Sequence, residues 1–366
     1  MADVKKVATR VSYGEALVEL GNERDDFVVL DADLAAATQT GKFKAAHPER
    51  FYDAGIAESN LMGLAAGIAT TGHVAFASTF AMFAAGRAYE QMRNSIGYPH
   101  LNVKIGATHA GISVGEDGAT HQCIEDYAIM RAIPNMIVFR PADSREVAAG
   151  WYQGLTGDRP VSLVLTRQDL PLYEKSGPAA LKGGYIIADS EKETPDVILL
   201  ASGSEVEPCV NAQALLKEKG VDARVVSMPS FELFDEQDEA YKQSVLPDGV
   251  RARVAVEAGA ELGWHKYVGL DGAVICMHGF GASAPYKTLF ENSFVLGKSP
   301  VPLFYGAACE DVNTIGGFAN WVQDAEYTAC PHCGKPMKYL AQIQWDTVFD
   351  CAEGTLYIEF CPDCQI

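Results

Sequence analysis

The chain has 366 residues, of which 48% are hydrophobic and 21% charged, and its formal net charge is −19. This length predicts two to three domains, and the composition is ordinary for a globular protein with well-filled cores. The negative charge disfavours nucleic acid and anionic membranes as partners. No apolar run is long enough to cross a bilayer and the first residues lack the core of a signal peptide, so we expect a cytoplasmic protein.

The first half of the chain alternates short apolar runs with helical patterns. Two of these patterns are residues 58–72, ended by Gly72, and residues 143–157, where Asp143 or Ser144 can cap the helix. The apolar runs have the length of strands buried on both faces; they are residues 27–31, 73–79, 102–108, 136–140 and 161–166. The alternation predicts an α/β fold with a doubly wound, mostly parallel sheet and helices on both faces.

A second α/β series follows a segment that breaks this pattern. Residues 171–184 contain two prolines, three glycines and charges of both signs, and we interpret 171–183 as an interdomain linker. The strand-like runs beyond it are residues 196–203, 222–228, 253–259 and 272–277, with a helical stretch at 204–220. The composition changes again near residue 325, which indicates a further small segment.

The most unusual stretch is GATHAGISVGEDGATHQ, residues 106–122. Its four glycines let the backbone approach a ligand closely. His109 and His121 can donate hydrogen bonds or move protons, and Asp117 can accept from a hydroxyl. A surface turn would not need so many titratable groups, so we interpret the stretch as part of a site at the carboxyl ends of the strands.

Several other polar and aromatic residues have ordinary structural interpretations. Glu58 can be a helix-start carboxylate attracted by the helix dipole. Phe80 and Phe83 have the spacing of core aromatics. Arg10 and Arg167 can each be a surface or salt-bridge arginine. These residues gain a functional interpretation only from a resemblance to a known family.

Taken together, the motifs resemble the C-terminal half of transketolase, from VATRVSYGEAL to about residue 324. The matching segments are VGEDGATHQ, RPADSREV, TRQDLP, KGGY, ASGSEVE and SVLPDGV, and GIAESNLMGLAAGIA is especially similar to the small subunit of split transketolases. The resemblance implies a thiamine-diphosphate enzyme that moves a two-carbon ketol unit between sugars. It assigns residues 5–170 to the pyrimidine-binding domain and 184–324 to the transketolase C-terminal domain.

The chain lacks the GDG motif with a later Asn that holds the diphosphate and its Mg²⁺ or Ca²⁺ in this family. In the family that motif belongs to a separate domain, normally N-terminal. The resemblance therefore implies a partner polypeptide, an N-terminal diphosphate-binding subunit, and a heterotetramer of the two chains.

The resemblance also assigns roles around the cofactor. Glu58 matches the glutamate that hydrogen-bonds N1′ of the aminopyrimidine and so favours the imino tautomer that deprotonates the thiazolium C2. Phe80 and Phe83 match the aromatic wall of the pyrimidine ring. Asp33 matches a carboxylate near the cofactor and the subunit contact.

Other residues are assigned to the sugar phosphate substrate. His121 matches a catalytic histidine near the substrate C2, and Asp117 matches the carboxylate that reads the C2 hydroxyl. A third group matches the phosphate grip, which uses charge-assisted hydrogen bonds; it consists of Arg10, His109 and Arg167.

Three positions depart from the larger enzymes of the family. Ser59 follows the catalytic glutamate where they have histidine, and Gly86 replaces a tyrosine. Both departures are similar to split transketolases. Ala37 stands where a serine joins the phosphate grip, which leaves a different acceptor or anion open.

The last segment, residues 327–366, is not part of transketolase. It contains two C-x-x-C pairs separated by runs that alternate like strands; the pairs are Cys330 with Cys333 and Cys361 with Cys364. Four thiolates at such spacing resemble a zinc ribbon with a structural Zn²⁺, and a segment this small needs a staple. Redox-active dithiols and two disulfides are the alternatives, and a cytoplasmic setting disfavours disulfides.

Two other functions remain open on the sequence. The chain can be the β subunit of a 2-oxo-acid dehydrogenase or part of a deoxyxylulose-phosphate-synthase-like enzyme, which share the fold and the glutamate. It can also be a non-catalytic binding or regulatory subunit that docks a partner through its tail. The wording of GEDGATHQ and TRQDLP favours transketolase over the first alternative, and the presence of Glu58 and both histidines argues against the second.

Overall fold

The computed structural model describes residues 6–283, 314–315, 338–344 and 355–360. These residues fall into two compact units. The first contains the chain up to Val114 and from Thr120 to His278; the second contains residues 115–119 and the described residues from Gly279 on. Each unit is described by itself.

The first unit begins with a six-stranded sheet in the order β3-β2-β4-β5-β7-β6, in which every neighbouring pair is parallel. Its strands are β2 (Phe27–Asp31), β3 (Phe51–Asp53), β4 (Val74–Phe80), β5 (Val103–Thr108), β6 (Ile137–Phe139) and β7 (Val161–Val164). All residues of β4 and β5 are buried, as the continuous apolar runs of the sequence predict. The expected doubly wound parallel sheet is confirmed, and the limits of the predicted strands differ from the observed ones by at most two residues.

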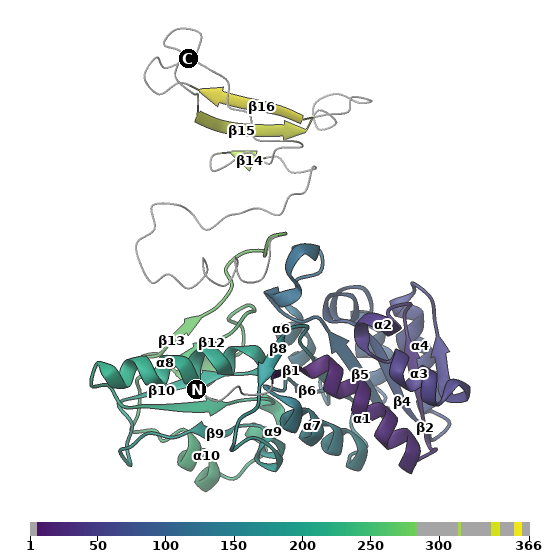
Figure 1. Cartoon of the computed structure of the whole chain (residues 1–366), viewed down its shortest axis with the longest axis horizontal. Coiled ribbons are helices and arrows are strands. Elements are labelled where there is room, and N and C mark those ends of the chain that lie inside the picture. Colours follow the sequence, from purple (N-terminus) through teal and green to yellow (C-terminus); the bar gives the residue numbers. More distant parts are fainter. Residues whose placement is uncertain (1–5, 284–313, 316–337, 345–354, 361–366) are drawn as a thin grey trace. The chain divides into compact units, whose positions relative to one another are not determined.

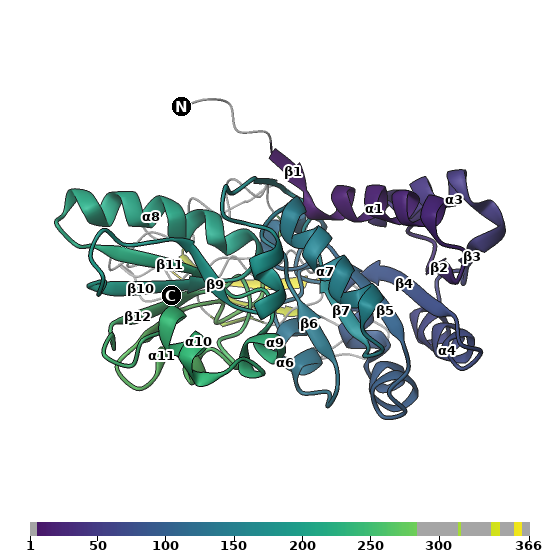
Figure 2. The same ribbon diagram turned by 90° about the horizontal axis from the view of Figure 1, so that it is seen from below.

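Helices cover both faces of this sheet (Figure 2). They are α1 (Thr9–Glu23), α2 (Ala35–Thr38), α3 (Gly41–Ala46), α4 (Glu58–Ala69), α5 (Tyr89–Gln91), α6 (Asp126–Arg131) and α7 (Ser144–Thr156). Side chains of successive strand residues point to opposite faces. Phe76 accordingly packs with Tyr13 of α1 and Trp151 of α7. Its neighbour Ala75 packs in a separate core with Leu61 of α4.

A second sheet in the same unit has the order β13-β12-β10-β11-β9. Figure 1 labels its strands β9, β10, β12 and β13, and Figure 2 labels β11. Its strands are β9 (Tyr185–Ala188), β10 (Val197–Ala201), β11 (Ala223–Ser227), β12 (Arg253–Val256) and β13 (Ala273–Ile275), and only β9 is antiparallel to its neighbour. The helices of this part are α8 (Val206–Glu218), α9 (Phe231–Asp235), α10 (Glu239–Val245) and α11 (His265–Val268). The second α/β series is therefore confirmed.

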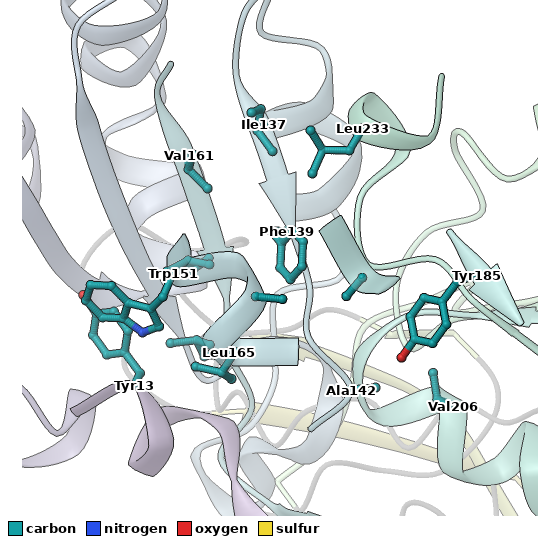
Figure 3. Close-up of a cluster of buried hydrophobic side chains, with 14 of the residues drawn as sticks. Tyr13, Ile137, Phe139, Ala142, Trp151, Val161, Leu165, Tyr185, Val206 and Leu233 are labelled. Carbon is teal, nitrogen blue, oxygen red and sulfur yellow. The ribbon is translucent and has the colours of Figure 1, made fainter. Parts of the chain in front are cut away.

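The two sheets share one hydrophobic core. Figure 3 shows Phe139 of β6 beside Leu233 of α9, and Ala142 beside Tyr185 and Val206. Next to this core, Arg140 is fully buried and its guanidinium contacts Glu205 and Glu257 at 2.5 Å each. Apolar packing and a buried ion-pair network together join the two halves of the unit.

The expected linker at 171–183 is a packed segment. It contains a 3₁₀ turn, η5 (Pro178–Lys182), and buried Ser176 and Ala180. Asp143, which caps α7 by accepting from Arg145 N and Glu146 N, also accepts from Tyr173 N at 3.0 Å. The sequence did not predict two short strands, β1 (Lys6–Ala8) and β8 (Asp169–Pro171). They pair with each other, and β8 ends at the first residue of this segment.

The second unit contains a three-stranded antiparallel sheet, β14 (Thr314–Ile315), β15 (Lys338–Gln344) and β16 (Thr355–Phe360). The two longer strands fall where the tail was predicted to have strands. Cys330, Cys333, Cys361 and Cys364 lie outside the described residues, so the predicted zinc site stays a prediction. Among the described side chains, no group of three or more His, Cys, Asp or Glu is arranged to hold a metal ion. No helix within the described ranges is long and apolar enough to span a bilayer.

Candidate active site

The residues expected to form the site follow the carboxyl ends of neighbouring parallel strands. Glu58 comes after β3, Phe80 ends β4, His109 follows β5 and Arg167 follows β7. Because β4 lies beside β5 and β5 beside β7, these ends meet at one edge of the sheet. Ligands of open parallel sheets bind at this edge.

Four aromatic rings cluster there. The ring of Phe80 stacks on that of His109 with centroids 3.9 Å apart, and on that of Phe83 at 5.6 Å with an interplanar angle of 18°. The His121 ring meets Phe83 edge-on at 5.3 Å and Phe80 at 6.1 Å. The structure therefore brings together four of the predicted residues, and it packs Phe80 and Phe83 against the rings of His109 and His121.

His109 is held in a conformation that few side chains adopt. Its φ is 60°, it is 3% exposed, and its Nδ1 lies 2.9 Å from Thr108 Oγ1. Burial, with the positive charges of Arg10 and Arg167, lowers the pKa of His109 to about 3. The imidazole is neutral at physiological pH and offers a hydrogen bond rather than a charge.

Arg10 and Arg167 are brought side by side by the pairing of β1 with β8. Thr9 Oγ1 lies 3.0 Å from Thr166 Oγ1 and accepts from Thr166 N at 2.8 Å. Burial first, and then the charge of Arg167, lower the pKa of Arg10. A short antiparallel contact thus concentrates two positive charges beside His109, as anion binding requires.

The two guanidinium groups are oriented by backbone carbonyls. Arg10 Nη1 donates to Ala37 O at 2.6 Å, and Arg167 Nη1 donates to Val114 O. The Nε of Arg10 is buried and has no hydrogen-bond partner in the described part of the chain. A buried donor without a partner is costly, so the position of this Nε indicates an acceptor other than the described residues.

Glu58 is the first residue of α4 and is 5% exposed. Its Oε1 accepts from Arg87 Nη1 at 2.8 Å, and Ser59 Oγ donates to Arg87 O at 3.0 Å. Arg87 was not among the residues predicted from the sequence. Arg87 lies four positions after Phe83, a spacing that puts both residues on one helix face. This spacing is the local pattern from which Arg87 could have been predicted.

Two acidic residues lie at the carboxyl end of β2, Asp31 as its last residue and Asp33 just after it. Asp33 is exposed with a φ of 62°, and its N donates to the Asp53 carboxylate at 3.0 Å. Asp31 is buried, accepts from Thr38 Oγ1 at 2.7 Å and Thr40 Oγ1 at 2.8 Å, and has its pKa raised to about 6 by burial. Asp31 therefore shapes the loop that presents Asp33.

Asp117 belongs to the second unit, in the segment 115–119. There, Gly115 and Gly118 have φ values of 80° and 74°, and Gly118 N donates to Gly115 O at 3.1 Å. Glycine adopts this left-handed backbone at little cost, which explains the glycines of the GEDG motif. The role of Asp117 stays a prediction.

Comparison with known proteins gives the chain its family. Residues 5–172 match the pyrimidine-binding domain of transketolase, and residues 183–295 match the transketolase-like C-terminal domain. A protein described as "Putative transketolase C-terminal section" from Methanocaldococcus jannaschii is 48% identical over 238 residues, which cover 62% of this chain and 72% of that protein. The chain belongs to the transketolase family. Its members are thiamine-dependent transferases.

Full-length transketolases match the same region. The Bacillus subtilis transketolase is 40% identical over 299 residues, covering 78% of this chain and 44% of the relative. A Pichia stipitis transketolase structure, in complex with xylulose 5-phosphate, superposes with a TM-score of 0.73 at 34% identity over 80% of this chain and 44% of that one. The chain thus spans less than half the length of these transketolases.

A solved split-gene transketolase matches along nearly all of its own length. It is described as an inactive beta4 tetramer, and it superposes with a TM-score of 0.67 at 39% identity over 78% of this chain and 93% of the other.

The transketolase family implies thiamine diphosphate and a divalent metal ion, and the residues present fit the pyrimidine end of that cofactor. The Arg87 guanidinium is planar, lies 4.1 Å from the Phe83 ring centroid and donates to Glu58. The same aromatic face and carboxylate can therefore receive another planar group with N–H donors.

Proposed function

We propose that the chain is the pyrimidine-binding and C-terminal subunit of a two-chain transketolase. In this proposal it transfers a two-carbon ketol unit from a ketose phosphate to an aldose phosphate. The observation that supports this proposal is the clustering of the Glu58 carboxylate, four aromatic rings and two arginines at one edge of the sheet. They belong to a chain that spans under half of a full transketolase.

Glu58 and the aromatic wall are assigned to the cofactor. When bound, thiamine diphosphate supplies the carbon nucleophile that carries the two-carbon unit. Glu58 holds a proton at N1′ of the aminopyrimidine, and burial of this carboxyl group excludes water from that hydrogen bond. Phe80 and Phe83 offer the apolar surface against which the ring stacks, and Asp33 lies near the subunit contact.

His109, His121, Arg10, Arg167 and Asp117 are assigned to the substrate. His121 acts near the substrate C2 and Asp117 reads the C2 hydroxyl. The neutral imidazole of His109 offers a hydrogen bond within the phosphate grip. Arg10 and Arg167 provide the charge for a phosphate. Arg10 Nε, which has no partner among the described residues, is one donor available to it. Because Ala37 contributes only its carbonyl to this region, the grip has one hydroxyl fewer than in the larger enzymes.

A partner chain completes the cofactor site in this proposal. The diphosphate and its Mg²⁺ or Ca²⁺ are held by a separate N-terminal subunit, and two copies of each chain form a heterotetramer in the cytoplasm. The structural neighbour described as an inactive β4 tetramer supports this, because it matches over 93% of its length and assembles in that form without activity.

The tail is proposed to bind one structural Zn²⁺ through Cys330, Cys333, Cys361 and Cys364. Support comes from the paired C-x-x-C spacing and from the antiparallel pairing of β15 with β16 between the two pairs. The metal content of the purified full chain tests it. One zinc per chain is expected, and a zinc-free, fully folded chain contradicts the proposal.

Reconstitution tests the main proposal. The purified chain alone is assayed for ketol transfer between sugar phosphates, and then again after mixing with a diphosphate-binding N-terminal transketolase subunit, thiamine diphosphate and Mg²⁺. Activity is expected only in the mixture. Full activity of the single chain contradicts the two-chain proposal, and decarboxylation of pyruvate without ketol transfer contradicts the transketolase assignment.

A further inference from the structure

Arg87 contacts both groups that the proposed function assigns to the pyrimidine ring. Its Nη1 donates to Glu58 Oε1 at 2.8 Å, and its Cζ lies 4.1 Å from the centroid of Phe83. Its side chain is 55% exposed, whereas that of Glu58 is 5% exposed. The arginine therefore reaches from solvent into the place where the buried carboxylate and the aromatic face meet.

The local backbone explains this position. Phe83 and Arg87 are the ends of a π-helical turn, η2 (Phe83–Arg87), closed by Ala88 N donating to Phe83 O at 3.3 Å. Single π-helical turns are frequent at functional sites. Ser59 Oγ donates to Arg87 O, so the main chain of Arg87 is tied to the start of α4 next to Glu58. The main chain is fixed while the exposed guanidinium has room to move.

A guanidinium resembles the edge of an aminopyrimidine that a carboxylate recognises. Both are planar, both carry N–H donors beside one another, and both stack on aromatic rings. A site built from one carboxylate and one ring face can take either group. It cannot take both, because a Cζ at 4.1 Å from the ring centroid leaves no space for a second planar group between them.

We propose that Arg87 is a placeholder for the aminopyrimidine. It satisfies Glu58 and covers Phe83 in the chain without cofactor, and it swings into solvent when the cofactor ring arrives. This inference rests on the proposed function. Only molecules in which Arg87 has left the site can bind the cofactor. The apparent dissociation constant therefore equals the intrinsic one divided by the fraction of such molecules.

The test uses Arg87→Met, which keeps an unbranched apolar stem as long as arginine up to Nε and removes the charged end of the guanidinium. Thiamine diphosphate with Mg²⁺ is titrated into the reconstituted two-chain complex, and the dissociation constant is measured by calorimetry. We expect about three- to tenfold tighter binding than in the wild type at low salt, because an ion pair with one exposed partner and a cation–π contact are each weak. The ratio should approach one at high salt, which screens the ion pair.

Arg93→Met is the matched control. Arg93 lies in the adjacent π-helical turn, η3 (Met92–Gly97), is exposed, and donates to Asn94 rather than to Glu58. Its substitution should leave the dissociation constant unchanged, and a structure of the loaded wild-type complex should show Arg87 separated from Glu58.

The outcomes separate the two proposals. If the wild-type complex binds the cofactor and R87M binds it no more tightly, the placeholder role is wrong while the proposed function stands. If R93M tightens binding as much as R87M, the effect is one of general charge and the placeholder role is also wrong. If no complex binds the cofactor, the proposed function fails and this inference fails with it.

Discussion

Replacing Lys104 by methionine should stabilise the chain near neutral pH. Lys104 lies on β5 and is 1% exposed, and its Nζ donates to Arg159 O at 2.7 Å. Its stem packs over Gly154 of α7, where a Cβ would lie 3.6 Å from Lys104 Cδ. Burial lowers the pKa of Lys104 to about 7, since the charged amine loses its hydration inside the sheet.

The sign of the pH dependence follows from the two states of the chain. Above about pH 7 the folded chain has released this proton, while the unfolded chain keeps it until near the ordinary lysine pKa. Wild-type stability should therefore rise with pH between these values, by up to about 1.4 kcal/mol per unit. Below pH 7 both states are protonated and the full cost of burying the charge remains.

Methionine removes that cost together with one hydrogen bond. Loss of the hydrogen bond to Arg159 O offsets about 1–2 kcal/mol of the gain from removing the buried charge. We therefore expect K104M to be about 1–3 kcal/mol more stable than the wild type at pH 6.5–7. The difference should shrink towards zero by pH 9–10, as the wild-type amine becomes neutral in the folded chain.

Urea unfolding of the full chain at a series of pH values measures this difference. Lys219→Met, at the exposed end of α8, is the control and should show little pH-dependent change. A K104M chain that is less stable than the wild type at every pH, or a difference that does not vary with pH, would refute the reasoning.

Two further predictions concern buried polar groups. Arg140→Met leaves Glu205 and Glu257 buried without their cation, so it should lower the free energy of unfolding by about 3–5 kcal/mol in urea titrations; a loss under 1 kcal/mol would show that the network is not needed for stability. Since the pKa of His109 is about 3, His109→Gln should raise the KM for a sugar phosphate in the reconstituted complex without changing how KM depends on pH from 5.5 to 8. Disappearance of a transition near pH 6–7 in H109Q would mean that His109 is charged in the binding step.

The sequence predicted the parts of the fold that depend on long buried strands. The runs at 27–31 and 102–108 became β2 and β5 with almost unchanged limits, because both faces of these strands are covered and every residue must be apolar or packed. β9 was missed because it is short, directly follows two glycines and alternates buried with half-buried residues. Its antiparallel pairing with β11 is decided by the tertiary fold.

In the site, too, local sequence patterns could be read, whereas contacts decided by the tertiary fold could not. His109 could be proposed from the residues themselves, because its glycine-rich stretch follows a strand and strand ends collect at one edge of a parallel sheet. Glu58 was proposed only through the resemblance to transketolase. The ion pair of Glu58 with Arg87 could not be found, because its partners are 29 positions apart and meet only after β3 and β4 are placed in the same sheet. The family motifs of the sequence include Glu58, but they do not include Arg87, which contacts it.

The most direct test of the central claim is the turnover of a reconstituted complex carrying Glu58→Gln. This change preserves the shape of the side chain and removes the carboxylate. The account predicts that E58Q still assembles with the N-terminal subunit and binds thiamine diphosphate, while ketol transfer falls by about 10²–10⁴-fold, the range expected for loss of a group that positions a proton. An E58Q complex with wild-type turnover would contradict the claim that this chain activates the cofactor through Glu58.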